Sequence, residues 1–136
     1  MIKPIMKSEF FLRLPSEDAG PDDAATGQDL LDTLREHEHE CVGLAANMIG
    51  VRKRIICVKD GNRALLMYNP QILEQVNSYQ TSEGCLSLSG ERPCTRYRRI
   101  KVEYLDENFV HRIKNFSGYT AEIIQHEIDH CCGIVI

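Results

Sequence analysis

Apolar residues recur at helical spacing early in the chain, at Leu30, Leu31, Leu34 and Cys41. Thr26 followed by Asp29 is typical of a helix start, so the pattern predicts a helix over about residues 27–40. The preceding residues 15–27 are polar and contain proline and glycine. They predict a surface loop that connects an N-terminal extension to the body of the domain.

Short apolar runs in the middle of the chain favour strands. Residues 55–58 form one run, residues 60–62 (Asp-Gly-Asn) are typical of a hairpin turn, and residues 64–68 predict the returning strand. Pro70 is expected to end that strand. Residues 72–82 predict another strand.

The last third of the chain combines a strand pattern with a second helix. Apolar residues alternate with charged ones over residues 99–104, which predicts a half-buried strand, and residues 106–108 predict a turn into residues 109–116. Ser117 can cap a helix whose apolar positions are Ile123, Ile124 and Ile128, and Gly133 can end it. Strands gathered between two helices predict an α+β fold with an antiparallel sheet.

Length, composition and charge exclude several classes of protein. The 136 residues suit one domain, residues 1–136, and 43% apolar with 26% charged residues predict a globular fold. A net charge of −4 disfavours a dedicated nucleic-acid binder. No apolar run is long enough for a membrane span, and the first residues do not form a secretory signal, so we expect a cytoplasmic protein. In that compartment the six cysteines are expected to be buried, catalytic or metal-binding, and Cys57 to be core.

The second helix carries the strongest chemical signal, Gln-His-Glu-Ile-Asp-His at residues 125–130. Residues four apart lie one turn apart on the same helix face, so His126 and His130 can bind one metal ion. Glu127 lies beside them, near enough to reach a water molecule at the metal. The alternative is a solvated helix with two unrelated histidines.

A catalytic metal site needs a third ligand. Only six residues follow His130, and Cys131 and Cys132 are too close to it for good geometry, although a structural site built from them stays open. Upstream, Cys85 in Glu-Gly-Cys-Leu-Ser is the best candidate, because Gly84 lets the backbone approach a metal. Two histidines and one cysteine leave a fourth position for water. A buried structural cysteine is the alternative.

Three segments together resemble the peptide deformylase family. They are residues 43–50 (Gly-Leu-Ala-Ala, then Ile-Gly), residues 83–87 (Glu-Gly-Cys-Leu-Ser) and the histidine motif at residues 125–130. The resemblance spans roughly residues 28–133. It implies an α+β fold in which antiparallel sheets surround a central metal-binding helix. It also implies a hydrolase that removes the N-formyl group from formyl-methionyl peptides of nascent proteins.

The resemblance also assigns roles to the matching residues. Cys85, His126 and His130 would hold Fe²⁺, with Zn²⁺ or Ni²⁺ as substitutes, whereas the ligand set alone would indicate zinc. Glu127 would be the general base acting on a metal-bound water. Leu86 would offer its backbone N–H to the formyl oxygen.

Further roles concern the substrate. Backbone groups of Val42, Gly43 and Gly84 would pair with an extended peptide as an added strand. Val42, Leu86 and Ile123 would line the space for the methionine side chain. An apolar lining is also what a protein core looks like.

The chain departs from the family pattern in two ways. Where the family's first motif reads Gly-x-Gly-x-Ala-Ala-x-Gln, this chain has Cys41 for the first glycine and Met48 for the glutamine. That glutamine donates a hydrogen bond to the oxyanion, and methionine has no donor. The sequence stops at Ile136, whereas longer members carry a C-terminal extension implicated in ribosome contact, which puts that contact in doubt.

Several interpretations therefore stand beside a catalytic deformylase. Met48 favours a relative with weak or no activity that binds metal and peptide; a metallopeptidase acting on other N-blocked peptides is a third possibility. A redox or structural-metal module using Cys131 and Cys132 is a fourth. Finally, Arg96 either lies on a solvated strand face or pairs with Asp129 to fix the metal-binding helix.

Overall fold

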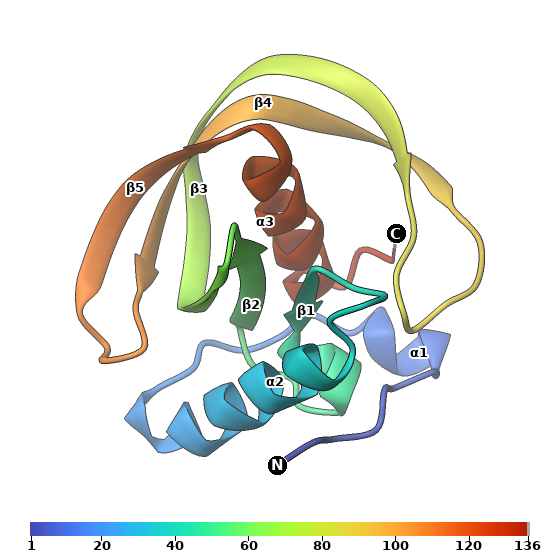
Figure 1. The fold of residues 1–136 in the computed structure, drawn as a ribbon, viewed down its shortest axis with the longest axis vertical. Coiled ribbons are helices and arrows are strands. Elements are labelled where there is room, and N and C mark those ends of the chain that lie inside the picture. The colour runs from blue at the N-terminus through green and yellow to red at the C-terminus, as the bar shows by residue number, and fades with distance from the viewer. Residues whose placement is uncertain (136) are drawn as a thin grey trace.

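The fold is one antiparallel sheet that curves around a helix, in a computed structural model that describes residues 1–135 (Figure 1). The elements in chain order are α1 Glu9–Leu12, η1 Pro21–Asp23, α2 Ala24–Glu36, β1 Gly43–Ala45, η2 Ala46–Ile49, β2 Ile55–Asp60, β3 Arg63–Glu83, β4 Arg92–Leu105, β5 His111–Ser117 and α3 Gly118–Cys131. The five strands lie in the order β1-β2-β3-β4-β5, and every neighbouring pair is antiparallel. The predicted α+β class is confirmed, with the expected sheets joined into one.

The α3 helix is the centre of the molecule. The long strands β3 and β4 arch over it in Figure 1, and it packs against β1, β2 and β4. Ile124 is fully buried on this helix, and the first four residues of β2, including Cys57, are buried as well, so the predicted core position of Cys57 is confirmed. Burial of apolar side chains on both elements fixes how α3 sits beneath the sheet.

The first predicted helix exists, but its bounds were wrong at both ends. It begins at Ala24 after the short helix η1, and Gly20 N–H donates to the Asp23 side chain (2.9 Å), so Thr26 is not its start. It ends at Glu36, and residues 37–40 form turns. Residues 38–40 are exposed and have no apolar side chain to bury, so packing does not extend the helix to Cys41. The predicted surface loop likewise contains η1 and the start of α2.

Pro70 does not end a strand, contrary to the sequence prediction. The predicted strands at 64–68 and 72–82 are one continuous strand, β3. Pairing between β3 and β4 is irregular between Tyr68 and Gln71, so proline occupies a point where the ladder is already interrupted. Asn69, with φ of 53°, exchanges hydrogen bonds with the Ala19 backbone (2.7 and 2.9 Å) and so anchors the bulge.

Most of the other predicted boundaries agree with the structure. The turn at residues 60–62 joins β2 to β3, and residues 106–108 lead to β5. Ser117 precedes α3, but its side chain makes no capping hydrogen bond. Gly133 has φ of 78° just after the helix, as expected of a glycine that ends one. None of the described helices is long and apolar enough to cross a membrane.

Candidate metal centre and active site

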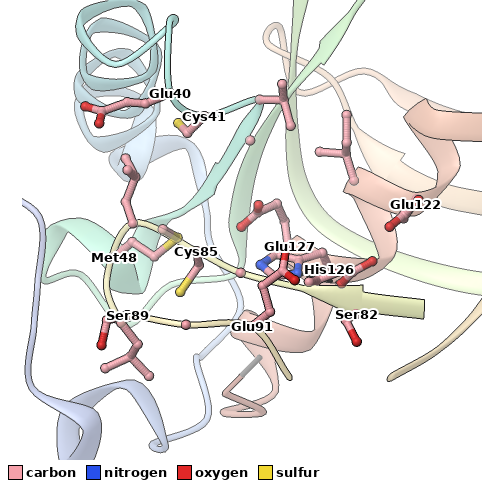
Figure 2. A pocket seen from close by; sticks show the side chains of 18 of the residues that line it. Glu40, Cys41, Met48, Ser82, Cys85, Ser89, Glu91, Glu122, His126 and Glu127 are labelled. Atoms are coloured by element: carbon pink, nitrogen blue, oxygen red, sulfur yellow. Dashed lines mark hydrogen bonds and ion pairs between the residues drawn. The ribbon is translucent and has the colours of Figure 1, made fainter. Parts of the chain in front are cut away.

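A cavity of about 780 Å³ lies between the edge strand β1, the loop at residues 84–91 and helix α3. Figure 2 shows its lining. All but one of the residues assigned by resemblance to the active site line this cavity: Val42, Gly43, Gly84, Cys85, Leu86, Ile123, His126 and Glu127. The fold thus gathers three segments far apart in the sequence around one space.

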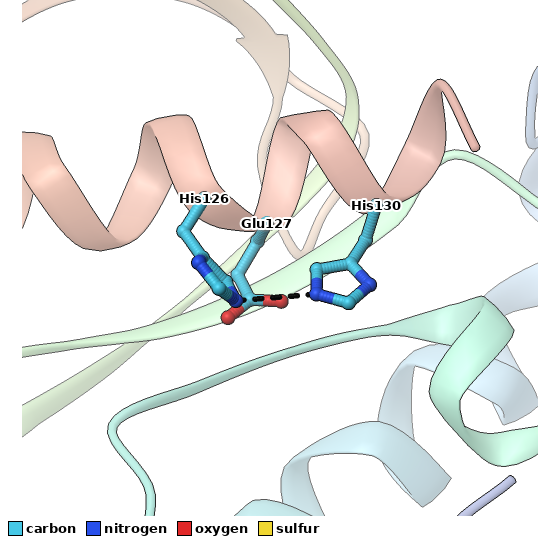
Figure 3. Close-up of side chains that lie close together, drawn as sticks. All are labelled: His126, Glu127 and His130. Atoms are coloured by element: carbon cyan, nitrogen blue, oxygen red, sulfur yellow. Dashed lines mark hydrogen bonds between the residues drawn. The ribbon is translucent and has the colours of Figure 1, made fainter. Parts of the chain in front are cut away.

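Helix α3 brings the histidine motif together as its spacing predicts. The Nε2 atoms of His126 and His130 are 3.1 Å apart, and ligand atoms of both histidines and Glu127 lie within 4.8 Å of one another (Figure 3). All three side chains are buried. The interpretation as a solvated helix with unrelated histidines is therefore wrong.

The geometry suits a divalent metal ion. Two imidazole nitrogens on a tetrahedral ion are separated by about 3.3 Å, given metal–nitrogen bonds of about 2.0–2.1 Å. The observed 3.1 Å between the Nε2 atoms is close to that separation. One buried carboxylate oxygen, Oε1 of Glu127, has no hydrogen-bond partner among the described residues, which suits a role toward a small ligand beside the ion.

Burial sets the protonation of Glu127. Glu127 is 3% exposed, and burial disfavours the charged form, raising the pKa of its carboxyl group to about 7 against the opposing effect of His126. A carboxyl group with a pKa near neutrality can both accept and return a proton.

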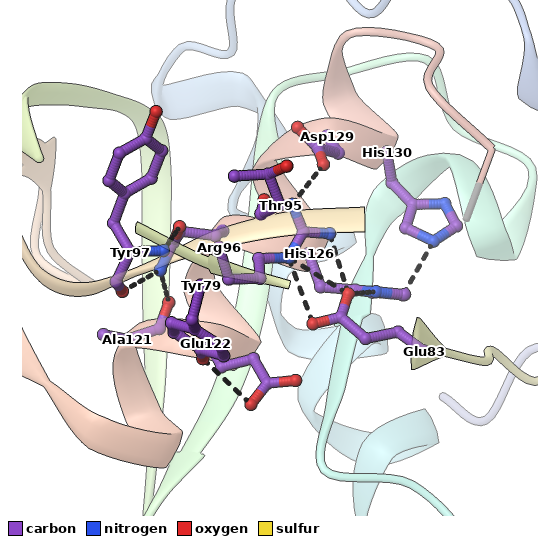
Figure 4. Close-up of polar contacts among 11 residues, drawn as sticks. Tyr79, Glu83, Thr95, Arg96, Tyr97, Ala121, Glu122, His126, Asp129 and His130 are labelled. Carbon is purple, nitrogen blue, oxygen red and sulfur yellow. Dashed lines mark hydrogen bonds and ion pairs between the residues drawn. The ribbon is translucent and has the colours of Figure 1, made fainter. Parts of the chain in front are cut away.

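Glu83 contacts the histidine pair, although sequence reasoning assigned it no role. Its Oε1 lies 2.7 Å from Nδ1 of His126, which directs the Nε2 of that imidazole toward His130 (Figure 4). Burial opposes ionisation of Glu83, but hydrogen bonds from His126 and Arg96 outweigh it and hold its pKa below the usual value. Burial likewise disfavours a charged His126, yet the bond to Glu83 and the nearby Glu127 raise the pKa of His126.

Arg96 completes this network. Its guanidinium contacts Glu83 at 2.7 Å through Nη2 and Asp129 at 2.7 Å through Nη1. Arg96 is 4% exposed, so its interpretation as part of a solvated strand face is wrong and the proposed pairing with Asp129 is confirmed. A charged side chain from β4 therefore joins the end of β3 to helix α3 (Figure 4).

Cys85 lies in the loop after β3 and lines the same cavity, half-buried. Its thiol is not a member of the three-residue cluster on α3. The loop is closed tightly, because a Cβ on Gly84 would lie 3.0 Å from the Gly90 carbonyl oxygen. The Leu86 carbonyl accepts a hydrogen bond from Lys7. The structure thus brings the predicted third ligand to the site's edge.

Strand β1 approaches α3 closely because it carries glycine. A Cβ on Gly43 would lie 2.7 Å from Ile123 Cγ2 and 2.9 Å from Glu127 Oε2. Any larger residue at this position would therefore push the Ile123 and Glu127 side chains out of place. Among the strands of residues 1–135, β1 lies at the edge of the sheet and pairs with β2 alone, so its other side is available to a further strand.

Met48, the residue that breaks the first motif, is buried at 1% exposure and lines the cavity. Its sulfur accepts a hydrogen bond from Ala45 N–H (3.4 Å). The neighbouring Asn47 points elsewhere, since its Nδ2 donates to the His130 carbonyl (2.8 Å). Elsewhere on the chain, Cys131 is buried and Cys132 exposed, and neither belongs to the histidine cluster or lines this cavity.

Comparison with known proteins identifies the family. The polypeptide deformylase family model matches residues 7–136. A peptide deformylase from Clostridium beijerinckii is 52% identical over 136 residues, the whole of both chains. The crystal structure of a peptide deformylase from Thermotoga maritima has a TM-score of 0.89 at 28% identity, covering 99% of this chain and 95% of that one.

A structure of the class I type b enzyme from Acinetobacter baumannii, bound to Met-Ala-Ser, also has a TM-score of 0.89. Its sequence identity is 28%, and the match covers 99% of this chain and 97% of that one. With the cavity, the paired histidines and the buried glutamate in place, the chain belongs to the polypeptide deformylase family, metal-dependent hydrolases that remove the N-formyl group from nascent peptides.

Proposed function

We propose that this chain hydrolyses formyl-methionyl peptides at the cavity between β1 and α3, with Glu127 as the general base. The convergence of His126 Nε2 and His130 Nε2 at 3.1 Å beside the buried Glu127 carries this proposal. Cys85 would be the third protein ligand, from the loop that borders the same cavity. Glu83 and Arg96 would hold His126 in the orientation that binding requires.

The ion would be Fe²⁺, with Zn²⁺ or Ni²⁺ able to replace it, since two imidazoles and a thiolate suit all three. When bound, a divalent ion lowers the pKa of water and polarises a carbonyl group. Glu127 would take a proton from the attacking water. As the bond between the formyl carbon and the nitrogen breaks, Glu127 would give that proton to the leaving amine, so that formate and a free N-terminus result.

The peptide would bind along the free edge of β1. Backbone groups of Val42 and Gly43 on one side and Gly84 on the other would pair with it as an added strand. Leu86 N–H would contact the formyl oxygen, and Val42, Leu86 and Ile123 would line the space for the methionine side chain. The related enzyme with bound Met-Ala-Ser supports a peptide ligand of this length. Since nascent chains are its substrate, we place the protein in the cytoplasm.

The experiment is anaerobic purification with iron, followed by metal analysis and activity assays on the same sample. We expect one metal per chain and release of formate from formyl-Met-Ala-Ser, with no cleavage of acetyl-Met-Ala-Ser or of the free peptide. Metal without turnover would favour the weakly active or inactive relative. Cleavage of the acetylated peptide would favour a broader metallopeptidase.

Met48 should limit the rate. Met48→Gln would place an amide donor where the family carries one, and loss of one such oxyanion donor typically lowers kcat by about 10²–10³-fold. We expect Met48→Gln to fold normally, since the two side chains are similar in length, and to raise kcat on formyl-Met peptides with little change in KM.

The comparison requires the same metal at equal occupancy in both proteins. Thermal unfolding should show that the buried position tolerates the amide, which can keep the contact with Ala45 N–H through its oxygen. An unchanged or lower kcat in folded, fully metallated Met48→Gln would show that this position does not supply the missing donor.

A further inference from the structure

The loop at residues 84–91 borders the cavity and has little polar attachment to the rest of the protein. It joins β3 to β4 and contains no helix or strand. Among the residues that the structure describes, the bond from Lys7 Nζ to the Leu86 carbonyl is the only hydrogen bond that joins this loop to another segment. The hydroxyl of Ser87, which is 2% exposed, has no partner among them. Lys7 is therefore the polar anchor of the loop that carries Cys85.

The N-terminal segment that carries this lysine is itself held in place. Lys3 N–H donates to Thr33 Oγ1 on α2 (2.9 Å), and Met6 N–H donates to the Met48 carbonyl on η2 (2.7 Å). The side chain of Met6 packs against the core. Lys7 follows directly, and its exposed side chain meets the loop beside α1 (Figure 1). Two adjacent residues thus contact both η2 and the loop, which border the cavity from different parts of the sequence.

The contact matters because of what Leu86 does on its other side. Under the proposed function, on which this inference rests, Leu86 N–H contacts the formyl oxygen. The carbonyl and the N–H of one residue flank the same Cα, so fixing the carbonyl restricts the direction in which the N–H points. Lys7 does not line the cavity, so it would act through Leu86 and not on the substrate. A misplacement of about 1 Å at a reacting group can lower a rate about 10²-fold.

We propose that Lys7 is a positioning residue, which anchors the loop at residues 84–91 so that Leu86 N–H meets the oxyanion as it forms. An ammonium group suits this role, because a charged donor makes a stronger hydrogen bond than a neutral one. Met48 offers no donor from its side of the cavity, so the oxyanion depends more on Leu86 N–H than it would beside the glutamine of the family motif. A hydrogen bond that strengthens in the transition state affects kcat more than KM.

The experiment measures kcat and KM on formyl-Met-Ala-Ser, and amide hydrogen exchange of residues 84–91, in the metal-loaded parent, Lys7→Met and Lys7→Arg. Methionine keeps the apolar stem but donates nothing. Because one hydrogen bond is worth about tenfold, we expect Lys7→Met to lower kcat about tenfold, to change KM less than about twofold, and to speed exchange in the loop about tenfold. Lys7→Arg, which also donates, should stay within about threefold of the parent in each measurement.

Lys3→Met is the matched control. It removes the same charge from the same segment, but the Lys3 ammonium faces Asp29 on α2 (3.9 Å) and not the loop. We expect parental values of kcat and of loop exchange in this variant. Thermal unfolding of all the variants should match that of the parent, since both lysines lie at the surface.

Hydrogen exchange reports on the loop without turnover, so the two proposals can fail separately. Faster loop exchange in Lys7→Met alone, in a chain that fails to hydrolyse formyl-Met-Ala-Ser, would support Lys7 as the anchor of the loop while refuting the proposed activity. Unchanged loop exchange in Lys7→Met, or parental kcat despite faster exchange, would overturn the inference. Equal changes in Lys3→Met, or a Lys7→Arg variant as impaired as Lys7→Met, would overturn it as well.

Discussion

Cys85→Ala and His126→Ala should each abolish stoichiometric metal binding. Each removes one of the three proposed protein ligands, and two ligands cannot make a stable site in competition with water. His126 also contacts Glu83, so the loss of this imidazole removes a hydrogen-bond partner from the buried Glu83 carboxylate. Metal analysis after gel filtration, with absorption spectra of the cobalt-substituted protein, gives the occupancy and shows whether thiolate is bound.

Cys132→Ala is the matched control, because this cysteine is exposed and lies outside the cavity. It should retain one metal per chain. Full occupancy in Cys85→Ala would refute the ligand assignment. Loss of metal in the Cys132 variant instead would favour a structural site at the end of α3.

The paired histidines of α3 could be predicted because their placement depends only on local helix geometry. Two helical residues four apart lie on the same face, one turn apart. In the structure the Nε2 atoms of His126 and His130 face one another as this spacing predicts. Glu83 could not be placed in the same way. Its contact to His126 spans 43 residues and depends on where a 21-residue strand ends, which the sequence pattern does not specify.

The error at Pro70 has a similar origin. A proline interrupts a strand only if its nitrogen is needed for pairing, and here the irregular register between Tyr68 and Gln71 removes that need. Asn69 stabilises the bulge through the Ala19 backbone, 50 residues away in sequence. Local propensity therefore predicted two strands where tertiary contacts sustain one.

Arg96 shows the same limit for charge patterns. Arg96, Arg98 and Arg99 lie in one basic run, yet Arg96 is buried between two carboxylates and the other two are exposed. Alternation along a strand places Arg96, Arg98 and Ile100 on one face, so it could not have distinguished the buried Arg96 from the exposed Arg98. Only the position of α3 beneath β4 supplies Asp129 as the partner of Arg96.

Glu127→Ala should separate chemistry from metal binding. Under the proposed mechanism Glu127 handles the proton of the attacking water and is not a ligand, so the variant should keep its metal. A positioned general base contributes about 10²–10⁴-fold in rate, and kcat on formyl-Met-Ala-Ser should fall by that factor. KM should change little if the peptide binds mainly to β1 and the loop at residues 84–91.

Glu127→Gln tests the same point with less disturbance of packing, since the amide fills the buried space beside Gly43 but cannot accept a proton as a carboxylate does. Both variants should lose activity while the control Glu107→Ala, at an exposed turn residue outside the cavity, keeps it. Metal content measured on the assayed samples decides the interpretation. If either Glu127 variant loses its metal, Glu127 is a ligand and the proposed proton transfer is wrong. If both retain metal and parental turnover, another group accepts the proton of water.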